Sequence, residues 1–353
     1  MLKALRREVK SLLRPAYLLL CIVGLLSLNS CSGLFSTKQK VAVSPILTPL
    51  RDASTTDLIN EVNRLAAVKS IRGKLDIQFQ DTSFATSGLA EKYRRVDATV
   101  TVQRPGKVFL VIQFLLADIA QMSSDGEHFR VAILKGDERY KRFVKGTNNA
   151  NYSEIKNGNS TGEKDAGARV EHQAVSALSN LRPQHLTDAF LVRGIAQPAE
   201  AGYFYTQSEL FEEETDTRPQ AKKGGRVVRG YYLLEELSQT GTGDLKLKRR
   251  FWFDRVNGIR LARVQTFDDH GAMDTEVSYS AEKSIGEGQT VRLPSHIELT
   301  RRKDQYSISM SYQSPESVTI DKVWPDSFFV LENKWGLPEV DLDANNSGAR
   351  NPR

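Results

Sequence analysis

The chain has 353 residues, of which 40% are hydrophobic and 26% are charged, with 24 Gly and 12 Pro. This length supports one or two domains with a sizeable core, and the composition excludes a disordered, collagen-like or polytopic membrane protein. The formal net charge is +6. Five basic residues against one acidic residue place +4 of it in the first thirty residues, which leaves +2 for the rest and argues against a nucleic-acid partner.

The N-terminus has the pattern of a secretory leader. A basic segment, residues 1–14, precedes an apolar run of about thirteen residues. A membrane-spanning helix needs about 20 apolar residues, so the pattern predicts a signal peptide over residues 1–30. The run ends in Leu28-Asn29-Ser30-Cys31, which resembles a bacterial lipobox. The resemblance implies that Cys31 is acylated, and Ser32 after it implies release to the outer membrane, with the protein facing the periplasm.

The cysteine count agrees with an anchor. The sequence contains 2 cysteines, Cys21 and Cys31. Cys21 lies inside the leader, so cleavage before Cys31 would leave no free thiol, no disulfide and no cysteine-based metal site. One acyl chain binds a membrane weakly, whereas several chains on one residue form a firm anchor. The expected partner of Cys31 is therefore membrane lipid.

A tether and then a helix are expected next. Residues 31–53 are polar, contain two prolines and show no sustained period, which predicts a flexible tether. Ser54 or Thr55 can cap a helix that follows. Apolar side chains recur there at helical spacing: Leu58, Val62, Leu65 and Ala66.

From residue 71 the chain alternates apolar and polar residues with period 2, which predicts strands. The clearest examples are residues 71–80, 96–103 and 306–312. Residues 108–112 are apolar at every position, so one face of that strand must contact something other than water. Turn signals rich in Gly, Pro and Asp separate these strands.

The middle of the chain is less regular. Residues 146–168 are rich in Asn, Gly and Ser and predict a solvated insertion, and residues 170–192 return to helical spacing with a break at Pro183. Strand patterning resumes at 203–211 and continues after a charged stretch, 212–226. Such an order predicts an α+β fold with one strongly curved antiparallel sheet. We expect a single domain over residues 54–335 and a polar, frayed tail over residues 336–353.

No catalytic motif occurs in a credible context. Residues 158–162 match the GxSxG pattern of serine hydrolases and residues 153–156 match the SxxK pattern of penicillin-binding proteins, but both lie in the polar insertion, without the neighbouring strand and helix that such a nucleophile needs. The 5 histidines form no HxxxH or HExxH pattern. Glu212-Glu213-Glu214 is typical of a solvated loop. We expect no enzyme activity, no catalytic residue, no metal site and no cofactor.

Several segments resemble the LolA/LolB superfamily of lipoprotein carriers. Residues 71–75 resemble the family's opening strand, 108–126 its central strands and Asp-Gly hairpin, 181–186 a helical segment that closes the barrel mouth, and 293–300 a hairpin near the C-terminus. The lipobox favours the LolB-like type. The resemblance implies a half-open, curved antiparallel β-barrel around an apolar cavity, with helices covering that cavity.

Strand period identifies a set of residues that share one face: Leu75, Ile77, Val100, Leu110, Ile112, Ile308 and Met310. These residues are expected either to line a cavity for acyl chains, where each buried methylene contributes ~0.8 kcal/mol, or to fill an ordinary core. Period alone does not say which face of each strand points inward.

Members of this superfamily carry a protruding apolar loop beside the central strands, which assists insertion of lipoproteins into the membrane. The matching residues here are Leu115 and Leu116. Because no Gly or Pro marks a turn at this position, the two leucines are equally compatible with a continuing buried strand.

The leading hypothesis is an outer-membrane lipoprotein that binds acyl chains of lipoproteins or other amphiphiles and acts in lipoprotein localisation, with a periplasmic carrier protein as a partner. The alternative is a structural or assembly lipoprotein of the envelope that docks a protein partner without binding lipid.

Overall fold

The computed structural model describes residues 41–82, 90–115, 117–135, 138, 141–148, 183–196, 202–256, 258–288 and 291–344. The signal peptide, Cys31, Leu116 and the GxSxG and SxxK matches lie outside these residues. The chain divides into two compact units, Met1–Pro45 and Ile46–Arg353. Every helix and strand below belongs to the second unit.

The first helix forms as its sequence predicts. Helix α2 spans Thr55–Ala66, and Ser54 caps it: the Asp57 backbone N–H donates to the Ser54 hydroxyl, while the Ser54 backbone N–H donates to the Asp57 carboxylate. These two hydrogen bonds satisfy the backbone N–H groups of Ser54 and Asp57, which would otherwise lack a partner at the start of the helix. The expected apolar stripe is buried. The described part of the middle helical segment is α4, Pro183–Phe190.

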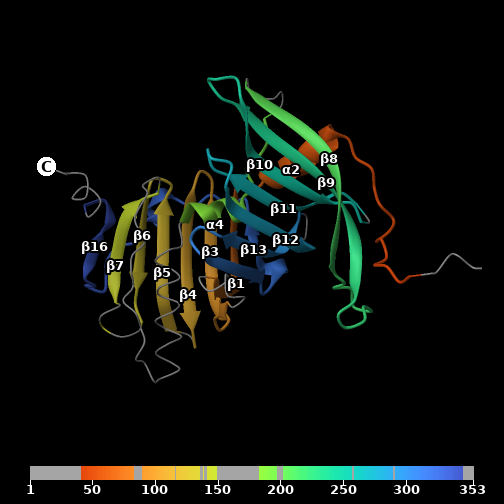
Figure 1. Cartoon of the computed structure of the whole chain (residues 1–353). Coiled ribbons are helices and arrows are strands. Elements are labelled where there is room, and N and C mark those ends of the chain that lie inside the picture. The colour runs from red at the N-terminus through yellow and green to blue at the C-terminus, as the bar shows by residue number, and fades with distance from the viewer. Residues whose placement is uncertain are drawn as a thin grey trace, which may run out of the picture. The chain divides into compact units, whose positions relative to one another are not determined.

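The strands run in sequence as β1 (Ser70–Asp81), β2 (Glu91–Lys92), β3 (Val96–Gln103), β4 (Lys107–Phe114), β5 (Ala117–Asp125), β6 (His128–Ile133), β7 (Arg142–Thr147), β8 (Tyr203–Thr215), β9 (Arg226–Gln239), β10 (Leu245–Asp254), β11 (Arg260–Phe267), β12 (Met273–Ile285), β13 (Val291–Arg301), β14 (Tyr306–Tyr312), β15 (Thr319–Ile320) and β16 (Glu339–Asp341). The described strands form one 16-stranded sheet in the order β16-β7-β6-β5-β4-β3-β1-β14-β13-β12-β11-β10-β9-β8, with β2 and β15 paired to β1 (Figure 1).

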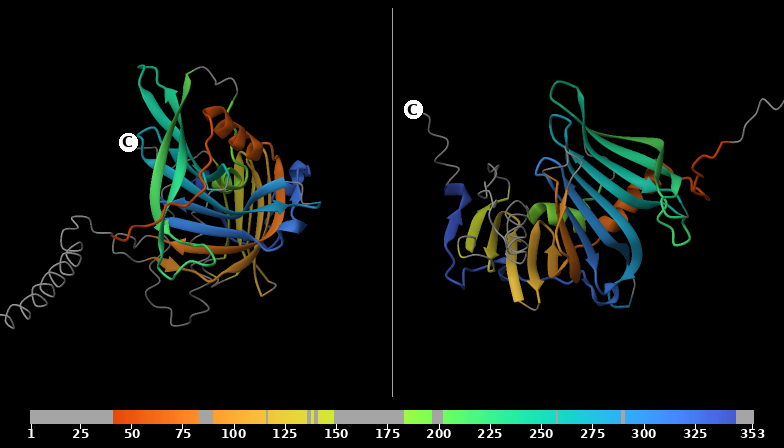
Figure 2. Two further views of the ribbon diagram at one scale, coloured as in Figure 1. Left: turned by 90° about the vertical axis from the view of Figure 1, so that its right-hand side faces the viewer. Right: turned by 60° about the horizontal axis from the view of Figure 1, so that its bottom comes forward.

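The pairing is antiparallel throughout, apart from the parallel pair β16–β7. Strand β1 lies at the centre, and two meanders of neighbouring strands extend from it in opposite directions. The predicted curved antiparallel sheet is therefore confirmed. Figure 2 shows that the strands curl around α2 and α4.

Cross-strand register brings apolar residues together on the inner face of the sheet. One row crosses from β9 to β1 through Leu234, Phe251, Val264, Val277, Leu299, Ile308 and Phe79. Another crosses from β3 to β7 through Val100, Leu110, Met122, Val131 and Val144. Opposed apolar pairs of this kind are what stabilises a sheet beyond its hydrogen bonds.

Both helices pack on that inner face. Helix α4 contacts β3, β4, β5 and β13, and α2 contacts β11. Leu186, Ala189 and Phe190 of α4 and Leu58, Val62 and Leu65 of α2 belong to the same buried cluster as the strands. The helices therefore supply the second layer that a half-apolar sheet requires.

The C-terminal segment, residues 315–341, covers the outer face of β4 and β5. It contains two short 3-10 helices, η3 (Pro315–Ser317) and η4 (Asp326–Phe329), and η4 contacts β4 and β5. The Phe109 and Phe328 rings lie 5.3 Å apart between centroids. This contact accounts for the apolar outward residue Phe109, while Val108, Leu110 and Ile112 enter the main core.

Three predicted boundaries differ from the structure. The fold begins before residue 54, because Ile46 and Leu50 bridge to Val228 and Val256. It also continues past residue 335, because β16 pairs with β7 inside the expected tail. Residues 212–215 of the charged stretch 212–226 belong to β8, and residues 216–225 connect β8 to β9 as expected. The loop assignment of Glu212-Glu213-Glu214 is therefore wrong: opposite strand partners such as Arg229 compensate the charge, with the Arg229 Nε to Glu214 Oε1 distance at 2.6 Å.

Candidate ligand-binding site

All seven residues predicted to share a face are buried in one cluster: Leu75, Ile77, Val100, Leu110, Ile112, Ile308 and Met310. The register places Ile77 opposite Met310 and Val100 opposite Leu110, and Leu75 and Ile112 both pair with Ala98. Their common face is the one that α2 and α4 cover. A contact between these residues and a ligand remains a prediction, because they do not line either of the two pockets described below.

One pocket lies on the inner face between α4 and strands β10–β12, with a volume of about 330 Å³. Its apolar floor consists of Val264, Val277 and Tyr279, which also belong to the buried cluster. Gln184, His185 and Asp188 of α4 lie on the opposite side. We call this space the α4 pocket. Its volume falls at the lower end of the range for small-molecule sites.

A row of polar residues crosses β9–β12 beside the apolar row that contains Val264 and Val277. Glu236, Arg249, Thr266 and Thr275 occupy successive strands at this level. Arg301 of β13 continues the row, since its guanidinium donates to the Thr275 hydroxyl at 2.8 Å. The inner face is thus amphipathic: an apolar floor meets a charged rim.

Arg249 holds the rim in place. Its guanidinium pairs with Glu236 at 2.5 Å and donates to the carbonyls of Arg193 and Gly194, in the segment after α4. Asp188 faces the same rim. The Asp188 side chain is 48% exposed; partial desolvation raises the pKa of its carboxyl, and the nearby charges of Arg193 and Arg104 partly oppose this shift.

Tyr279 forms one wall of the α4 pocket. Its hydroxyl donates to the Ala189 carbonyl at 3.1 Å, which ties β12 to the C-terminal end of α4. Burial raises the pKa of Tyr279 well above its ordinary value, so this hydroxyl stays protonated and can keep donating at physiological pH. This hydrogen bond holds the hydroxyl end of the ring at the border of the pocket.

Leu115 lies in the turn between β4 and β5 and not within a strand. Its φ of 47° is in the left-handed region, and its side chain is 80% exposed. The expectation of a continuing buried strand is therefore wrong for Leu115, and no glycine was needed for this turn. The Arg94 guanidinium lies 5.3 Å from the centroid of the neighbouring Phe114 ring. The hairpin tip thus combines an exposed leucine with an adjacent cation.

Sequence reasoning missed the residues of the α4 pocket. Val277 and Tyr279 alternate with polar neighbours, and this period-2 signal could have placed them on the inner face. Their position beside α4 depends on tertiary packing. Within the described ranges, no group of three or more His, Cys, Asp and Glu residues could hold a metal ion, and no helix is long and apolar enough to cross a membrane.

No protein-family model and no curated protein matches the chain. Among solved structures, the chain is similar to a DUF1329 family protein from Desulfovibrio piger, at 10% identity and a TM-score of 0.42, over 78% of this chain and 95% of that one. It is also similar to a LolA superfamily protein from Nitrosomonas europaea, at 10% identity and a TM-score of 0.40, over 79% and 99%.

A third similar structure is a domain from Vibrio parahaemolyticus named for outer membrane lipoprotein sorting, at 11% identity and a TM-score of 0.37, over 77% of this chain and 94% of that one. Two of these three structures carry LolA-superfamily or lipoprotein-sorting names, and the third belongs to the DUF1329 family. The LolB-like type remains a prediction.

Proposed function

We propose that this protein is an outer-membrane lipoprotein that faces the periplasm, binds acyl chains of lipoproteins or related amphiphiles, and acts in lipoprotein localisation or insertion. The observation that carries the proposal is the α4 pocket: an apolar floor of Val264, Val277 and Tyr279 inside a curved sheet, beneath a charged rim. An acyl chain fits the floor and a polar head group fits the rim. Burial of methylenes provides ~0.8 kcal/mol each, so binding requires no catalytic group and no cofactor.

The helices have the role of covers in this proposal. Helix α4 lies over the pocket and packs on β3, β4, β5 and β13 through Leu186, Ala189 and Phe190; on the pocket side, Tyr279 donates to the Ala189 carbonyl and Arg249 to the carbonyls of residues 193 and 194. In this proposal, a shift of the pocket side of α4 breaks these side-chain hydrogen bonds and widens the pocket, while the hydrogen bonds between the strands remain.

The hairpin tip would deliver the ligand. Leu115 extends into solvent beside Arg94, a combination that suits the boundary between lipid tails and anionic head groups. Acylated Cys31 would keep the tip near its membrane, and a periplasmic carrier protein would supply the lipoprotein. Replacement of Cys31 by Ser is expected to abolish incorporation of labelled fatty acid, and persistent labelling would contradict the anchor.

The binding proposal is tested by displacement of a fluorescent fatty acid from the purified protein by palmitate. We expect one saturable site. Val277→Trp should fill the α4 pocket and reduce binding, whereas the matched control Ser309→Trp, on the other face of β14, should leave binding unchanged. Equal binding by both variants would place the ligand elsewhere, and no binding by the unmodified protein would reject the proposal.

One observation favours the alternative, a structural lipoprotein that docks a protein partner. Strand β8 pairs only with β9 among the described strands, and Phe204 and Phe211 on it are almost half exposed. An edge strand of this length can accept a strand from another chain. A protein that binds no fatty acid but captures an envelope protein through β8 would support this alternative.

A further inference from the structure

The sheet splits between β11 and β12. Their ladder runs from the hairpin end as far as the pair Arg263–Ser278 and stops there. Beyond this pair, Arg260 and Leu261 pair only with β10, and residues 279–285 pair only with β13, within the part of the chain that the structure describes. Two neighbouring strands therefore present unpaired backbone edges to each other. The two views of Figure 2 show the group β8–β11 diverging from the strands that follow.

A cleft of about 320 Å³ fills this split, and we call it the β11–β12 cleft. Its apolar floor is formed by Leu65 of α2, Leu261 and Tyr279, all of which belong to the buried cluster. Tyr279 lines both this cleft and the α4 pocket. One side chain therefore separates an opening in the sheet from the inner pocket.

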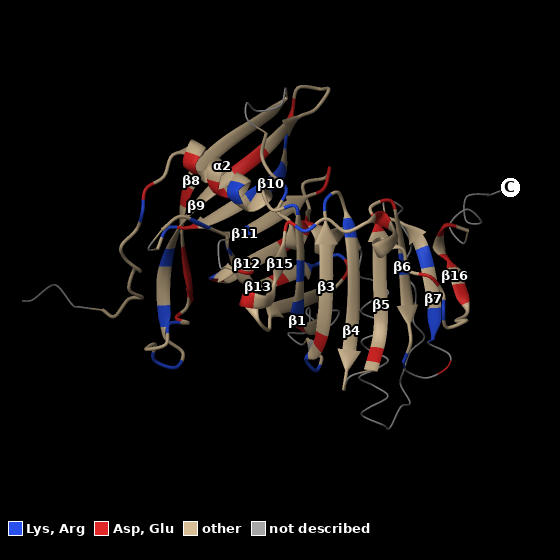
Figure 3. Cartoon of the chain, turned by 180° about the vertical axis from the view of Figure 1, so that it is seen from behind, with Lys and Arg blue, Asp and Glu red and all other residues tan. Residues whose placement is uncertain are grey.

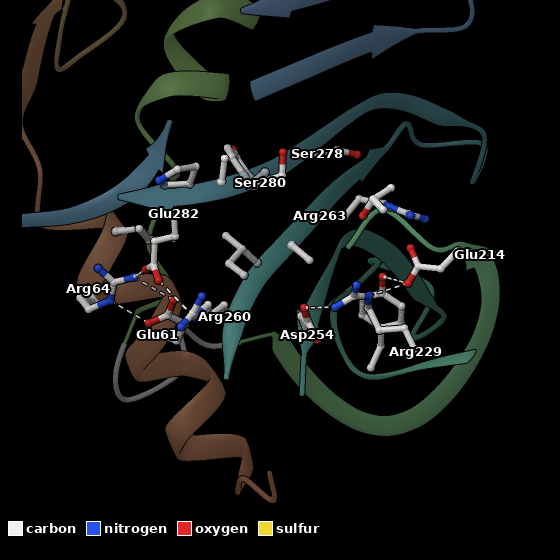
Figure 4. Close-up of a pocket in the computed structure, with 18 residues that line it drawn as sticks. Glu61, Arg64, Glu214, Arg229, Asp254, Arg260, Arg263, Ser278, Ser280 and Glu282 are labelled. Atoms are coloured by element: carbon white, nitrogen blue, oxygen red, sulfur yellow. Dashed lines mark hydrogen bonds and ion pairs between the residues drawn. The ribbon is translucent and has the colours of Figure 1, made fainter. Parts of the chain in front are cut away.

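Three arginines from α2, β11 and β13 surround Glu282 of β12; Arg64 and Arg260 line the cleft with Glu282, and Arg292 lies beside the cleft through its pair with Glu282. Glu282 pairs with three arginines, at 3.3 Å from Arg64, 3.2 Å from Arg260 and 3.1 Å from Arg292. The only other carboxylate paired in this cluster is Glu61, at 2.7 Å from Arg64 (Figure 4). Three guanidinium groups thus face two carboxylates among the described residues.

The exposure of these groups differs. The side chains of Arg260 and Arg292 are 46% and 58% exposed, whereas that of Glu282 is 14% exposed. Each guanidinium carries five N–H donors, and a single shared carboxylate occupies few of them. Donors at the mouth of the cleft therefore remain available to an anion.

The opposite wall has no excess of positive charge. Arg229 lies between Glu214, at 2.6 Å, and Asp254, at 2.7 Å. Arg263 lines the same wall and lies 3.8 Å from Glu212, so two cations face three carboxylates there. Figure 4 shows this group across the cleft from the arginine cluster. The excess positive charge is confined to one side of the mouth.

We propose that the β11–β12 cleft is a second binding site, which holds the anionic head group of a single-chain amphiphile while the chain enters the interior. Arg260 and Arg292 contact the head group, and the chain passes Leu65 and Leu261 to Tyr279 and the α4 pocket. This inference rests on the proposed acyl-chain function and adds to it the class of head group and the path of entry.

The first test measures head-group preference with the full chain, expressed with its leader and purified in an amphipathic polymer. The probes are palmitate and lysophosphatidylglycerol, which are anionic, and lysophosphatidylcholine, which is zwitterionic. Replacement of Arg260 and Arg292 together by Gln is expected to weaken binding of the anionic probes by about tenfold or more, as expected when charge-assisted hydrogen bonds are lost. Lysophosphatidylcholine binding should change little.

A larger loss for lysophosphatidylglycerol than for palmitate would identify a phosphate head group, and the reverse would identify a carboxylate. Both results support the site. Equal changes for all three probes, or no change for any of them, would overturn it.

The second test blocks the cleft. Ala262→Trp places a large ring in the split and should slow uptake of a fluorescent fatty acid by about tenfold at unchanged thermal midpoint, while the control Thr206→Trp on β8 should not. Unchanged uptake by Ala262→Trp, with the unmodified protein still binding lipid, would reject this entry path alone. A complete absence of binding by the unmodified protein would instead reject the proposed function.

Discussion

The two halves of the sheet differ in what covers them. Strands β3–β5 have α4 on their inner face and the C-terminal segment on their outer face, and their charged residues lie only at their ends (Figure 3). Strands β8–β12 carry charges along their length and border both the α4 pocket and the β11–β12 cleft. Strands β3–β5 are packed on both faces, and we call them the support. Strands β8–β12 border the pocket and the cleft. The proposed ligand site therefore belongs to the second half.

The largest expected effect tests the support. Phe329 is fully buried under β4 and β5, and its ring lies 5.3 Å from that of Phe328. Phe329→Ala is expected to lower the free energy of unfolding by about 3–5 kcal/mol, the usual cost of deleting a buried ring. Chemical denaturation measures this. Fatty-acid affinity per folded molecule should not change, and a parallel loss of affinity would contradict the division between the halves.

An added ring should distinguish the halves directly. Ile112→Phe overpacks the support and is expected to cost about 1–3 kcal/mol of stability without affecting binding. Val264→Phe extends into the α4 pocket, so it should cost less stability and reduce fatty-acid binding. The two variants serve as controls for each other in denaturation and displacement assays. The reverse assignment would place the cavity among the seven residues that strand period predicted.

Strand period predicted the support well. The apolar run 108–112 required a cover on both faces, and the structure supplies α4 on one face and Phe328 on the other. The cap at Ser54 and the inward face of α2 also follow from local sequence. In each case the physical signal lies within a few residues, where side chains alternate or recur at fixed spacing.

The pockets could not be predicted in the same way. The β11–β12 cleft exists because a ladder ends at Arg263–Ser278, and no turn residue or break in β11 marks that point in the sequence. Its arginine cluster unites Arg64 with Arg260 and Arg292, from three separate elements. The run Glu212-Glu213-Glu214 resembled a loop because its compensating charges lie on another strand.

The hairpin tip offers a smaller effect, separate from stability. Leu115 is 80% exposed with a positive φ, a conformation that Asn tolerates better than most residues. Leu115→Asn is therefore expected to change stability by less than about 0.5 kcal/mol. It should slow transfer of a fluorescent acyl ligand from the protein to vesicles containing anionic lipid. Unchanged transfer would remove the tip from the delivery step.

The smallest expected effect concerns pH. The native pKa of Asp188 lies above its ordinary value of 3.8, because partial desolvation disfavours the charged carboxylate even though its side chain is 48% exposed. Folding therefore favours the protonated form, and its stabilising contribution is complete below pH 3.8 and is lost as pH rises through the native pKa. Asp188→Asn should match the unmodified protein in acid and exceed its thermal midpoint at neutral pH. A lower midpoint at neutral pH would mean that pairing with Arg193 outweighs burial.

The central claim is that the half containing β8–β12 holds an acyl chain. Mass spectrometry of lipid extracted from the purified full chain tests it most directly, with Val264→Phe purified in parallel. For the unmodified protein we predict about one molecule of acyl-bearing lipid per protein molecule, in addition to the chains attached to Cys31. For Val264→Phe we predict much less. Equal lipid in both preparations, or none beyond the covalent chains, would contradict the account.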